Sequence, residues 1–262
     1  MASRLADQVV LVTGASSGIG AACARAFAAE GARLVVLARR RAAMDAAIPD
    51  LLARGAPDVA VVVTDVRDAT AVRCAIDGLP PALKEIEILV NNAGLSRGLD
   101  KIQDGSIEDW DEMIDTNVKG LLHVDRTVVP LMVARGRGTV IHLGSIAGRQ
   151  VYPGGNVYCA SKHAVRALTD GLRLDLLGTG VRVASVDPGL VTDTEFSAVR
   201  FHGDTKRAAT VYRGMTPLSA ADVAEVVAFV ATRPPHVTLA EALVLPTDQA
   251  SVSNIHRRDD DR

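Results

Sequence analysis

Hydrophobic positions in this chain form short continuous runs, separated by longer segments in which they recur every three or four residues. The runs are apolar throughout rather than alternating, which is typical of parallel strands buried on both faces. Seven runs are predicted to be strands: Val9–Val12, Leu34–Leu37, Val59–Val63, Ile88–Val90, Thr139–Leu143, Val181–Val186 and Ala242–Leu245.

The longer segments have helical spacing, and several follow a Ser, Asp or Thr of the kind that caps helices. Six are predicted to be helices: Gly20–Glu30, Met44–Arg54, Ala69–Leu79, Trp110–Ala134, Tyr158–Leu177 and Ala220–Thr232. This alternation predicts an α/β fold with a doubly wound, mostly parallel, Rossmann-like sheet in a single domain. We expect the domain to span residues 1–255, with an irregular substrate lid at 190–212 and a polar tail at 256–262.

Composition and charge restrict the class of partner. The 262 residues include 29 Lys and Arg and 31 Asp and Glu, for a formal net charge of -2. This balance gives no electrostatic reason to expect nucleic acid or a membrane, and no apolar run approaches the ~20 residues that cross a bilayer. Three cysteines without a C-x-x-C pair fit a reducing compartment, so a cytoplasmic protein with a small-molecule substrate is expected. The six histidines lack metal-ligand spacing, and we expect no metal.

A glycine-rich segment follows the first predicted strand and leads into a helix. It reads Thr13-Gly14-Ala15-Ser16-Ser17-Gly18-Ile19-Gly20. Glycines let a backbone turn tightly and approach a pyrophosphate, and a helix N-terminus presents free N–H groups and partial positive charge to it. The G-x-x-x-G-x-G spacing differs from the G-x-G-x-x-G dinucleotide fingerprint, and alone it would also fit a simple tight turn.

Further motifs follow in a fixed order along the chain. Asn91-Asn92-Ala93-Gly94 comes after the fourth strand, Ser145 stands thirteen residues before Tyr158-x-x-x-Lys162, and Pro188-Gly189 precedes Thr192. With the glycine loop and Asn117, this set resembles the short-chain dehydrogenases/reductases over residues 7 to about 246.

The resemblance implies roles for these residues. It implies a catalytic tetrad of Asn117, Ser145, Tyr158 and Lys162, in which Asn117 kinks its helix and holds a water that links Lys162 to solvent. It implies that Asn-Asn-Ala-Gly supports the sheet, that Asp65 and Val66 contact adenine, and that the segment from Pro188 folds over the nicotinamide. It also implies a homotetramer, because the family is commonly tetrameric.

The spacing of the catalytic residues agrees with carbonyl chemistry. Tyr158 and Lys162 are four apart in a predicted helix and therefore share one face. Reduction of a carbonyl needs a hydride on carbon and a proton on oxygen, and a nearby ammonium such as that of Lys162 lowers the pKa of a tyrosine from its ordinary value of about 10. Ser145 ends a strand, where its hydroxyl can hold the substrate oxygen. Taken alone, Ser145 could equally be a helix cap.

The end of the second strand predicts which dinucleotide binds. NAD-binding folds place an acidic residue there, on the ribose 2′-hydroxyl, but this chain has Ala38 followed by arginines. Arg39 and Arg40 are therefore predicted to grip the 2′-phosphate of NADP(H) through charge-assisted bonds. The predicted cofactor-binding residues are Gly14, Ser16, Ser17, Gly18, Ile19, Gly20, Arg39, Arg40, Asp65, Val66, Asn92, Ala93, Gly94, Tyr158, Lys162, Pro188, Gly189, Val191 and Thr192.

A narrower resemblance bears on the substrate. Residues 106–117, 154–158 and 188–204 resemble the NADP-dependent 3-hydroxy acid dehydrogenases, which act on short acids of the serine and 3-hydroxypropionate type. The substrate-binding residues expected are Ser145, Tyr158 and Arg200, with Arg200 or Arg149 as the cation for the carboxylate. Arg149 departs from the pattern of that branch. A carbonyl reductase of neutral ketones or aldehydes is the alternative, and an NADPH-binding sensor or scaffold without turnover is a third reading.

Overall fold

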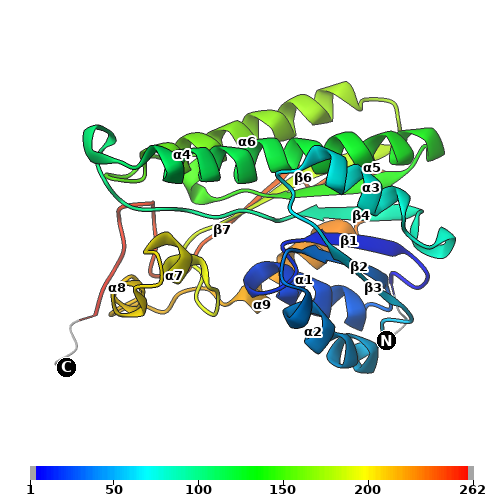
Figure 1. The fold of residues 1–262 in the computed structure, drawn as a ribbon, viewed down its shortest axis with the longest axis horizontal. Coiled ribbons are helices and arrows are strands. Elements are labelled where there is room, and N and C mark those ends of the chain that lie inside the picture. The colour runs from blue at the N-terminus through cyan, green and yellow to red at the C-terminus, as the bar shows by residue number, and fades with distance from the viewer. Residues whose placement is uncertain (1–3, 259–262) are drawn as a thin grey trace.

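A parallel sheet with helices on both faces organises the chain (Figure 1). The computed structural model describes residues 4–258, and the predicted positions at 1–3 and 259–262 lie outside that range. The described strands are β1 (Val9–Thr13), β2 (Arg33–Ala38), β3 (Val59–Val63), β4 (Ile86–Asn91), β5 (Gly138–Leu143), β6 (Val181–Pro188) and β7 (Glu241–Val244). They pair in parallel in the order β3-β2-β1-β4-β5-β6-β7. The predicted doubly wound sheet is confirmed, and the strands described here are parallel throughout.

The helices form two layers. Their bounds are α1 (Gly18–Ala29), α2 (Arg41–Arg54), α3 (Ala69–Asp77), α4 (Ile107–Ile114), α5 (Leu121–Arg135), α6 (Asn156–Asp175), α7 (Phe196–Arg200), α8 (Thr205–Thr210) and α9 (Ala220–Ala231). One core packs α1, α2 and α9 against the sheet, and a second packs α3, α5 and the end of α6 against its other face (Figure 1). Short 3-10 turns lie at Pro81–Leu83, Ile102–Asp104 and Ile146–Gly148.

The helix predicted over Trp110–Ala134 is interrupted. A π-helical turn, Asp115–Gly120, separates α4 from α5. Within it the Asn117 side chain bonds the backbone of Leu95 in the loop after β4. Gly120 allows close packing there, since a Cβ would lie 2.7 Å from Cγ2 of Val66. Periodicity alone misses such a turn, because the hydrophobic pattern continues through it.

A buried polar network ties the centre of the sheet to the helices on one face. Asp125 of α5 accepts a hydrogen bond from Nδ2 of Asn91 (3.1 Å) and lies 3.0 Å from Nε2 of His142. The Thr169 hydroxyl, which donates to the carbonyl of Val165, also lies 2.8 Å from Nδ1 of His142. His142 therefore bridges α5 and α6 through the sheet, and Asp125 is the common acceptor.

Residues 190–212, expected to be irregular, contain the short helices α7 and α8 (Figure 1). The segment begins with a bridge between Val191 and Leu218. Its two ends are joined by Tyr212, whose hydroxyl donates to the carbonyl of Val191 (2.8 Å) and bonds Ser197 (2.8 Å). The segment is a closed loop held by its own hydrogen bonds.

The predicted polar tail is attached to the body over its described part, residues 256–258. The guanidinium of Arg258 pairs with Asp248 at 2.7 Å, and its backbone N–H donates to the carbonyl of Gly214 at 2.7 Å. These two contacts hold residues 256–258 against the body of the protein.

The buried network makes a stability prediction. Asp125→Ala should lower the free energy of unfolding by about 3 kcal/mol, because Asn91 and His142 lose their shared buried acceptor. Urea denaturation followed by circular dichroism measures the loss. Asp170→Ala is the control, since its pair with Arg173 lies at the surface and should contribute less than about 0.5 kcal/mol. Equal stability of the two variants would contradict the prediction.

Candidate active site

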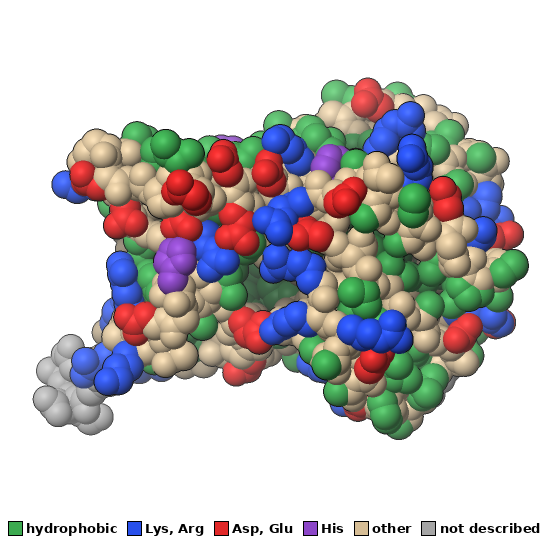
Figure 2. Space-filling view, viewed as in Figure 1, with side chains coloured by type: hydrophobic (Ala, Val, Ile, Leu, Met, Phe, Trp, Pro, Cys, Tyr) green, Lys and Arg blue, Asp and Glu red, His purple; other side chains and the backbone are tan. Residues whose placement is uncertain are grey.

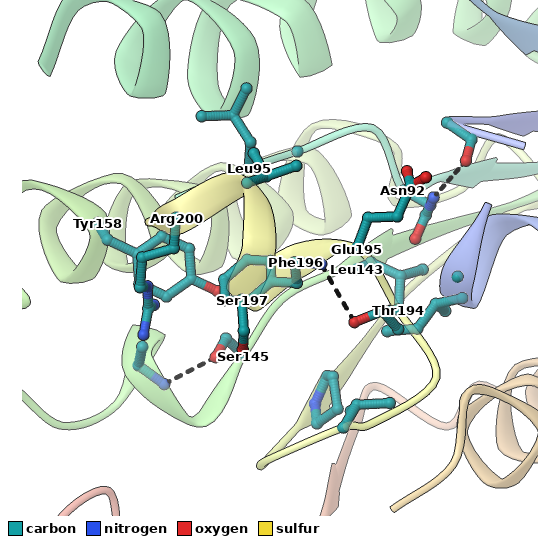
Figure 3. Close-up of a pocket in the computed structure, with 18 of the residues that line it drawn as sticks. Asn92, Leu95, Leu143, Ser145, Tyr158, Thr194, Glu195, Phe196, Ser197 and Arg200 are labelled. Carbon is teal, nitrogen blue, oxygen red and sulfur yellow. Dashed lines mark hydrogen bonds between the residues drawn. The ribbon is translucent and has the colours of Figure 1, made fainter. Parts of the chain in front are cut away.

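A cavity of about 680 Å³ opens at the carboxyl ends of the strands. It lies where the winding of the sheet reverses, between β1 and β4, which is where open α/β sheets bind ligands. On the face seen in Figure 2, a recess near the centre is bordered by both basic and acidic side chains. In Figure 3, Ser145, Tyr158, Phe196 and Arg200 gather at one end of the cavity, and Asn92 and Thr194 lie toward the other.

Most of the predicted site residues line this cavity. They are Gly14, Ser16, Ser17, Gly18, Ile19, Arg39, Arg40, Asp65, Val66, Asn92, Ala93, Gly94, Ser145, Tyr158, Lys162, Pro188, Gly189, Val191 and Arg200. Gly20, Asn117 and Thr192 are not part of the lining. Gly20 supports the loop from behind, since a Cβ there would lie 2.4 Å from the carbonyl oxygen of Gly14. Thr192 instead donates its N–H to Leu218, and Thr194 reaches the cavity.

The glycine loop forms a tight cradle. Gly14 has φ of +67°, and a Cβ on it would lie 2.8 Å from Nδ2 of Asn92. That amide donates to the carbonyl of Thr13 at 2.8 Å. The Thr13 hydroxyl accepts from the N–H groups of Asn92 and Ala93, both at 2.9 Å. The loops after β1 and β4 are therefore fixed together, and the start of α1 opens onto the cavity, as a bound pyrophosphate would need.

Cationic and hydroxyl groups meet at the end of β2. Arg40 donates to the Ser16 hydroxyl (3.1 Å) and the Ser17 hydroxyl (2.8 Å), and Arg39 lies 3.8 Å from Asp65. Two guanidinium groups with two hydroxyls fit a 2′-phosphate chemically. Arg40 also forms an ion pair with Glu195, and this pair holds the pKa of Glu195 below its usual range.

Lys162 is buried at the catalytic end. It is 7 % exposed, and its Nζ donates to the carbonyl of Leu143 at 2.8 Å. Burial lowers the pKa of Lys162 to about 8, and the nearby Asp187 carboxylate opposes that shift. The ammonium therefore stays charged at neutral pH only at a cost in stability.

Tyr158 is a second buried titratable group at the catalytic end. Burial raises the pKa of Tyr158, opposed first by the Arg200 guanidinium and then by a hydrogen bond with Ser145. The guanidinium carbon of Arg200 lies 5.3 Å from the centre of the Tyr158 ring. From the sequence we expected Lys162 to lower the pKa of Tyr158. In the structure the strongest lowering effect comes from Arg200, because its charge lies over the ring.

Ser145 and Asn117 have structural partners as well. The Ser145 hydroxyl accepts from the N–H of Ala147 at 3.1 Å, so Ser145 also caps a short turn. Asn117 bonds both backbone groups of Leu95 at 2.8 Å and donates to Ser161 of α6 at 3.0 Å. Asn117 thus connects the loop after β4 to the helix that carries Tyr158 and Lys162.

Of the two arginines considered for a carboxylate, one is engaged elsewhere. Arg149 donates to the Asp187 carboxylate (2.7 Å) and also pairs with Glu241, and it is not among the residues that line the cavity. The expectation for Arg149 is therefore wrong, because two carboxylates neutralise it beside β6 and β7. Arg200, by contrast, lines the cavity although only 8 % exposed.

Arg200 sits in an aromatic cluster that the sequence did not reveal. Its guanidinium carbon lies 4.9 Å from the ring centre of Phe196 and 5.8 Å from that of Tyr152. It donates to the Tyr152 hydroxyl (2.9 Å) and to the Ser96 hydroxyl (3.0 Å). Phe196 lies four residues before Arg200 on α7, and this helical spacing could have indicated their contact. Tyr152 and Ser96 come from distant segments, and nothing in the sequence indicated that they contact Arg200.

Two kinds of feature were not found. Within residues 4–258, no group of three or more His, Cys, Asp or Glu side chains could hold a metal ion. Over the same residues, no helix combines the length and apolar character needed to span a bilayer.

Comparison with known proteins assigns the family. A family model described as short chain dehydrogenase matches residues 8–204. The chain belongs to this family. As a short chain dehydrogenase, it is an enzyme of the oxidoreductase class, and its motif order agrees with the resemblance found in the sequence.

Relatives extend over nearly the whole chain. An NADP-dependent 3-hydroxy acid dehydrogenase of Schizosaccharomyces pombe is 40% identical over 98% of this chain and 99% of its own. Sulfoacetaldehyde reductase 2 of Chromohalobacter salexigens is 46% identical over 93% and 96%. The solved closed form of serine dehydrogenase complexed with NADP+ has a TM-score of 0.90 at 41% identity, covering 96% of this chain and 100% of that one.

Burial of Lys162 predicts a conflict between function and stability. Lys162→Met should raise the free energy of unfolding at pH 7 by about 2 kcal/mol. Burial of the ammonium destabilises the folded wild type by about 3 kcal/mol. The variant is relieved of this cost but loses the hydrogen bond to Leu143, which contributes about 1 kcal/mol. Between pH about 8 and 10.5 the unfolded chain binds more protons than the folded chain, so wild-type stability rises with pH and the difference shrinks.

Urea denaturation without cofactor at pH 7 and pH 9.5 measures this effect. Lys206→Met, at an exposed position of α8, is the control and should change stability by less than about 0.5 kcal/mol at either pH. A Lys162→Met variant less stable than wild type at pH 7 would disprove the conflict.

Proposed function

We propose that this enzyme transfers a hydride between NADP(H) and a short 3-hydroxy acid, of the serine or 3-hydroxypropionate type, or its oxo form. The observation that supports the substrate class is Arg200, a nearly buried guanidinium held over the Tyr158 ring in the wall of the cavity. The names of the relatives support the cofactor, because they are NADP-dependent or complexed with NADP+.

In this proposal Tyr158 is the acid and base. Bound NADP(H) supplies or accepts the hydride. Burial raises the pKa of Tyr158, so its phenol is protonated at neutral pH, and the Arg200 charge and the Ser145 hydrogen bond oppose that rise and favour transfer of the proton to a carbonyl oxygen. Ser145 holds the substrate oxygen beside Tyr158, and Lys162 grips the nicotinamide ribose. Asn117 positions α6 through Ser161 and supports the path by which Lys162 exchanges protons with solvent.

The cofactor would lie along the cavity from β2 to Ser145. Glycines 14 and 18 with Ser17 and Ile19 would receive the pyrophosphate, Asp65 and Val66 the adenine, and Arg39 and Arg40 the 2′-phosphate. Residues 92–94 and the stretch from Pro188 to Val191 would support the ribose and nicotinamide. We assign residues 190–212 as the lid, with Thr194 in the contact first expected of Thr192.

Arg200 would bind the anionic group of the substrate. Its Nε and one Nη are used on Ser96 and Tyr152, which fixes the plane of the guanidinium. The side chain therefore offers its other Nη from a rigid position at the catalytic end of the cavity. A sulfonate would suit the same donors, and one relative is named for sulfoacetaldehyde, which carries that group. Turnover of neutral ketones or aldehydes is the alternative.

We also propose a cytoplasmic homotetramer. Free cysteines fit a reducing compartment. Large apolar side chains are exposed on the outer helices and the edge strand, as oligomer interfaces require. They include Leu122, Leu131, Leu174, Phe229 and Leu243.

The acid role of Tyr158 is tested by Tyr158→Phe. Turnover should fall at least about 10²-fold, since general acid–base catalysis contributes about 10²–10⁴-fold, while the NADP⁺ dissociation constant changes little. Stopped-flow and steady-state absorbance at 340 nm give turnover, and cofactor fluorescence gives binding. Tyr152→Phe removes a hydroxyl from the same cluster and should keep kcat within about tenfold. Wild-type turnover by Tyr158→Phe would refute the assignment.

The substrate class is tested by Arg200→Met. The KM for 3-hydroxypropionate or serine should rise at least about tenfold, because a charge-assisted contact is worth about 1.5–3 kcal/mol, while the KM for a neutral secondary alcohol stays unchanged. The kcat should fall for both substrates, because Tyr158 loses the charge beside its ring. Arg207→Met is the matched control, since Arg207, on α8 of the lid, is another arginine that lies over a ring, that of Phe201. An equal rise in KM for acid and neutral substrates would point to a packing role, and activity only on neutral compounds would favour the alternative.

A further inference from the structure

The lid and the proposed 2′-phosphate site are joined by one ion pair. The Glu195 carboxylate accepts from both terminal nitrogens of Arg40, at 2.6 and 2.8 Å. The Ser17 hydroxyl donates to the same carboxylate at 2.9 Å. The pair has the two-pronged geometry in which a guanidinium binds carboxylates and phosphates. Glu195 therefore uses the donors that an incoming phosphate would need.

The two partners belong to parts of the chain that are otherwise separate. Arg40 immediately precedes α2, whereas Glu195 immediately precedes α7 in the lid. The neighbouring Thr194 packs on the glycine loop, since a Cβ on Gly18 would lie 3.1 Å from its side chain. Figure 3 shows Thr194 and Glu195 on the same lid segment as Phe196 and Arg200. The ion pair thus holds the start of the lid against the cofactor loop.

The Glu195 carboxylate and a 2′-phosphate would compete for Arg40, and they differ in charge. The Arg40 and Glu195 side chains are 50% and 52% exposed, and exposed ion pairs contribute about 1 kcal/mol or less. A 2′-phosphate carries about −1.5 to −2 charges against one for a carboxylate, and it offers three acceptor oxygens. The phosphate would displace Glu195, whereas a dinucleotide with a 2′-hydroxyl would leave the pair in place.

We propose that Glu195 is an internal competitor for the 2′-phosphate site and a determinant of cofactor specificity. Displacement of Glu195 from Arg40 releases the start of the lid, so NADP(H) and not NAD(H) frees this end of it. The inference rests on the proposed role of Arg40 as a phosphate clamp. It adds that the arginine proposed to bind the 2′-phosphate also holds the start of the lid, through its ion pair with Glu195.

The test uses adenosine 2′,5′-bisphosphate, which carries the phosphate without nicotinamide, and adenosine 5′-monophosphate, which lacks the 2′-phosphate. Calorimetry on the full chain gives both dissociation constants. Glu195→Gln should bind the bisphosphate about three- to fivefold more tightly, because it no longer competes for Arg40, and should bind the monophosphate unchanged. In an Arg40→Ala background the Glu195→Gln substitution should have no effect, since the competition is gone.

Asp50→Asn is the charge-matched control. It removes the same charge on α2, where Asp50 pairs with Arg54, and should leave bisphosphate binding unchanged. Lid release is read separately by hydrogen exchange over residues 194–200. Exchange there should be faster in Glu195→Gln than in wild type, and in wild type it should rise with the bisphosphate but not with the monophosphate.

The possible results distinguish a failure of the phosphate clamp from a failure of the competition by Glu195. If Arg40→Ala binds the bisphosphate as wild type does, both the clamp and the competition are overturned. If Arg40→Ala weakens binding but Glu195→Gln does not strengthen it, the competition alone is overturned. A gain in Glu195→Gln that is equal for both nucleotides, or matched by Asp50→Asn, also overturns it, because it would be a general effect of charge.

Discussion

The Thr13 hydroxyl joins the two strands at which the sheet reverses its winding, and the rest of the site is built outward from it. It accepts from the backbone of Asn92 and Ala93, which fixes the loop after β4 against the glycine loop. The same loop continues to Leu95, whose backbone is held by Asn117. Asn117 in turn bonds Ser161 on α6. One chain of buried hydrogen bonds therefore runs from the cofactor cradle to the helix that carries the catalytic pair, and such buried bonds are costly to leave unmade.

Two cations are buried at the catalytic end, and they are stabilised in different ways. Lys162 has a single hydrogen bond to Leu143, and burial lowers its pKa. The Arg200 guanidinium is surrounded by two hydroxyls and three aromatic rings, and guanidinium groups are not deprotonated in proteins. The permanent positive charge beside Tyr158 thus comes from the lid, while Lys162 lies near its titration range. Electrostatics at the phenol consequently depend on where the lid sits.

The sequence predicted the parallel sheet and the order of motifs, because buried strands and glycine turns leave local signals. The hydrophobic period did not predict the π turn at Asp115–Gly120, since one inserted residue barely disturbs it, and only the family resemblance implied a kink at Asn117. The sequence also suggested Arg149 as a substrate-binding residue, whereas Arg149 pairs with Asp187 and Glu241, which are 38 and 92 residues away. Glu195 escaped notice for the same reason, since its partner Arg40 is 155 residues distant. The local sequence pattern predicts the strands, the helices and the motif positions. It does not predict which side chains pair when they are remote in the sequence.

Helix α7 connects the two charged contacts of the lid. Glu195 immediately precedes this helix and Arg200 is its last residue, so they are about 7.5 Å apart along the axis at about 1.5 Å per residue. The backbone bond from the N–H of Val199 to Glu195 and the bond between Ser197 and Tyr212 hold this short helix together. A displacement of Glu195, as proposed, would therefore act on the helix that carries Arg200. The groups that would bind the cofactor phosphate and the substrate anion lie at opposite ends of one element, which gives a physical route from dinucleotide choice to the electrostatics of Tyr158.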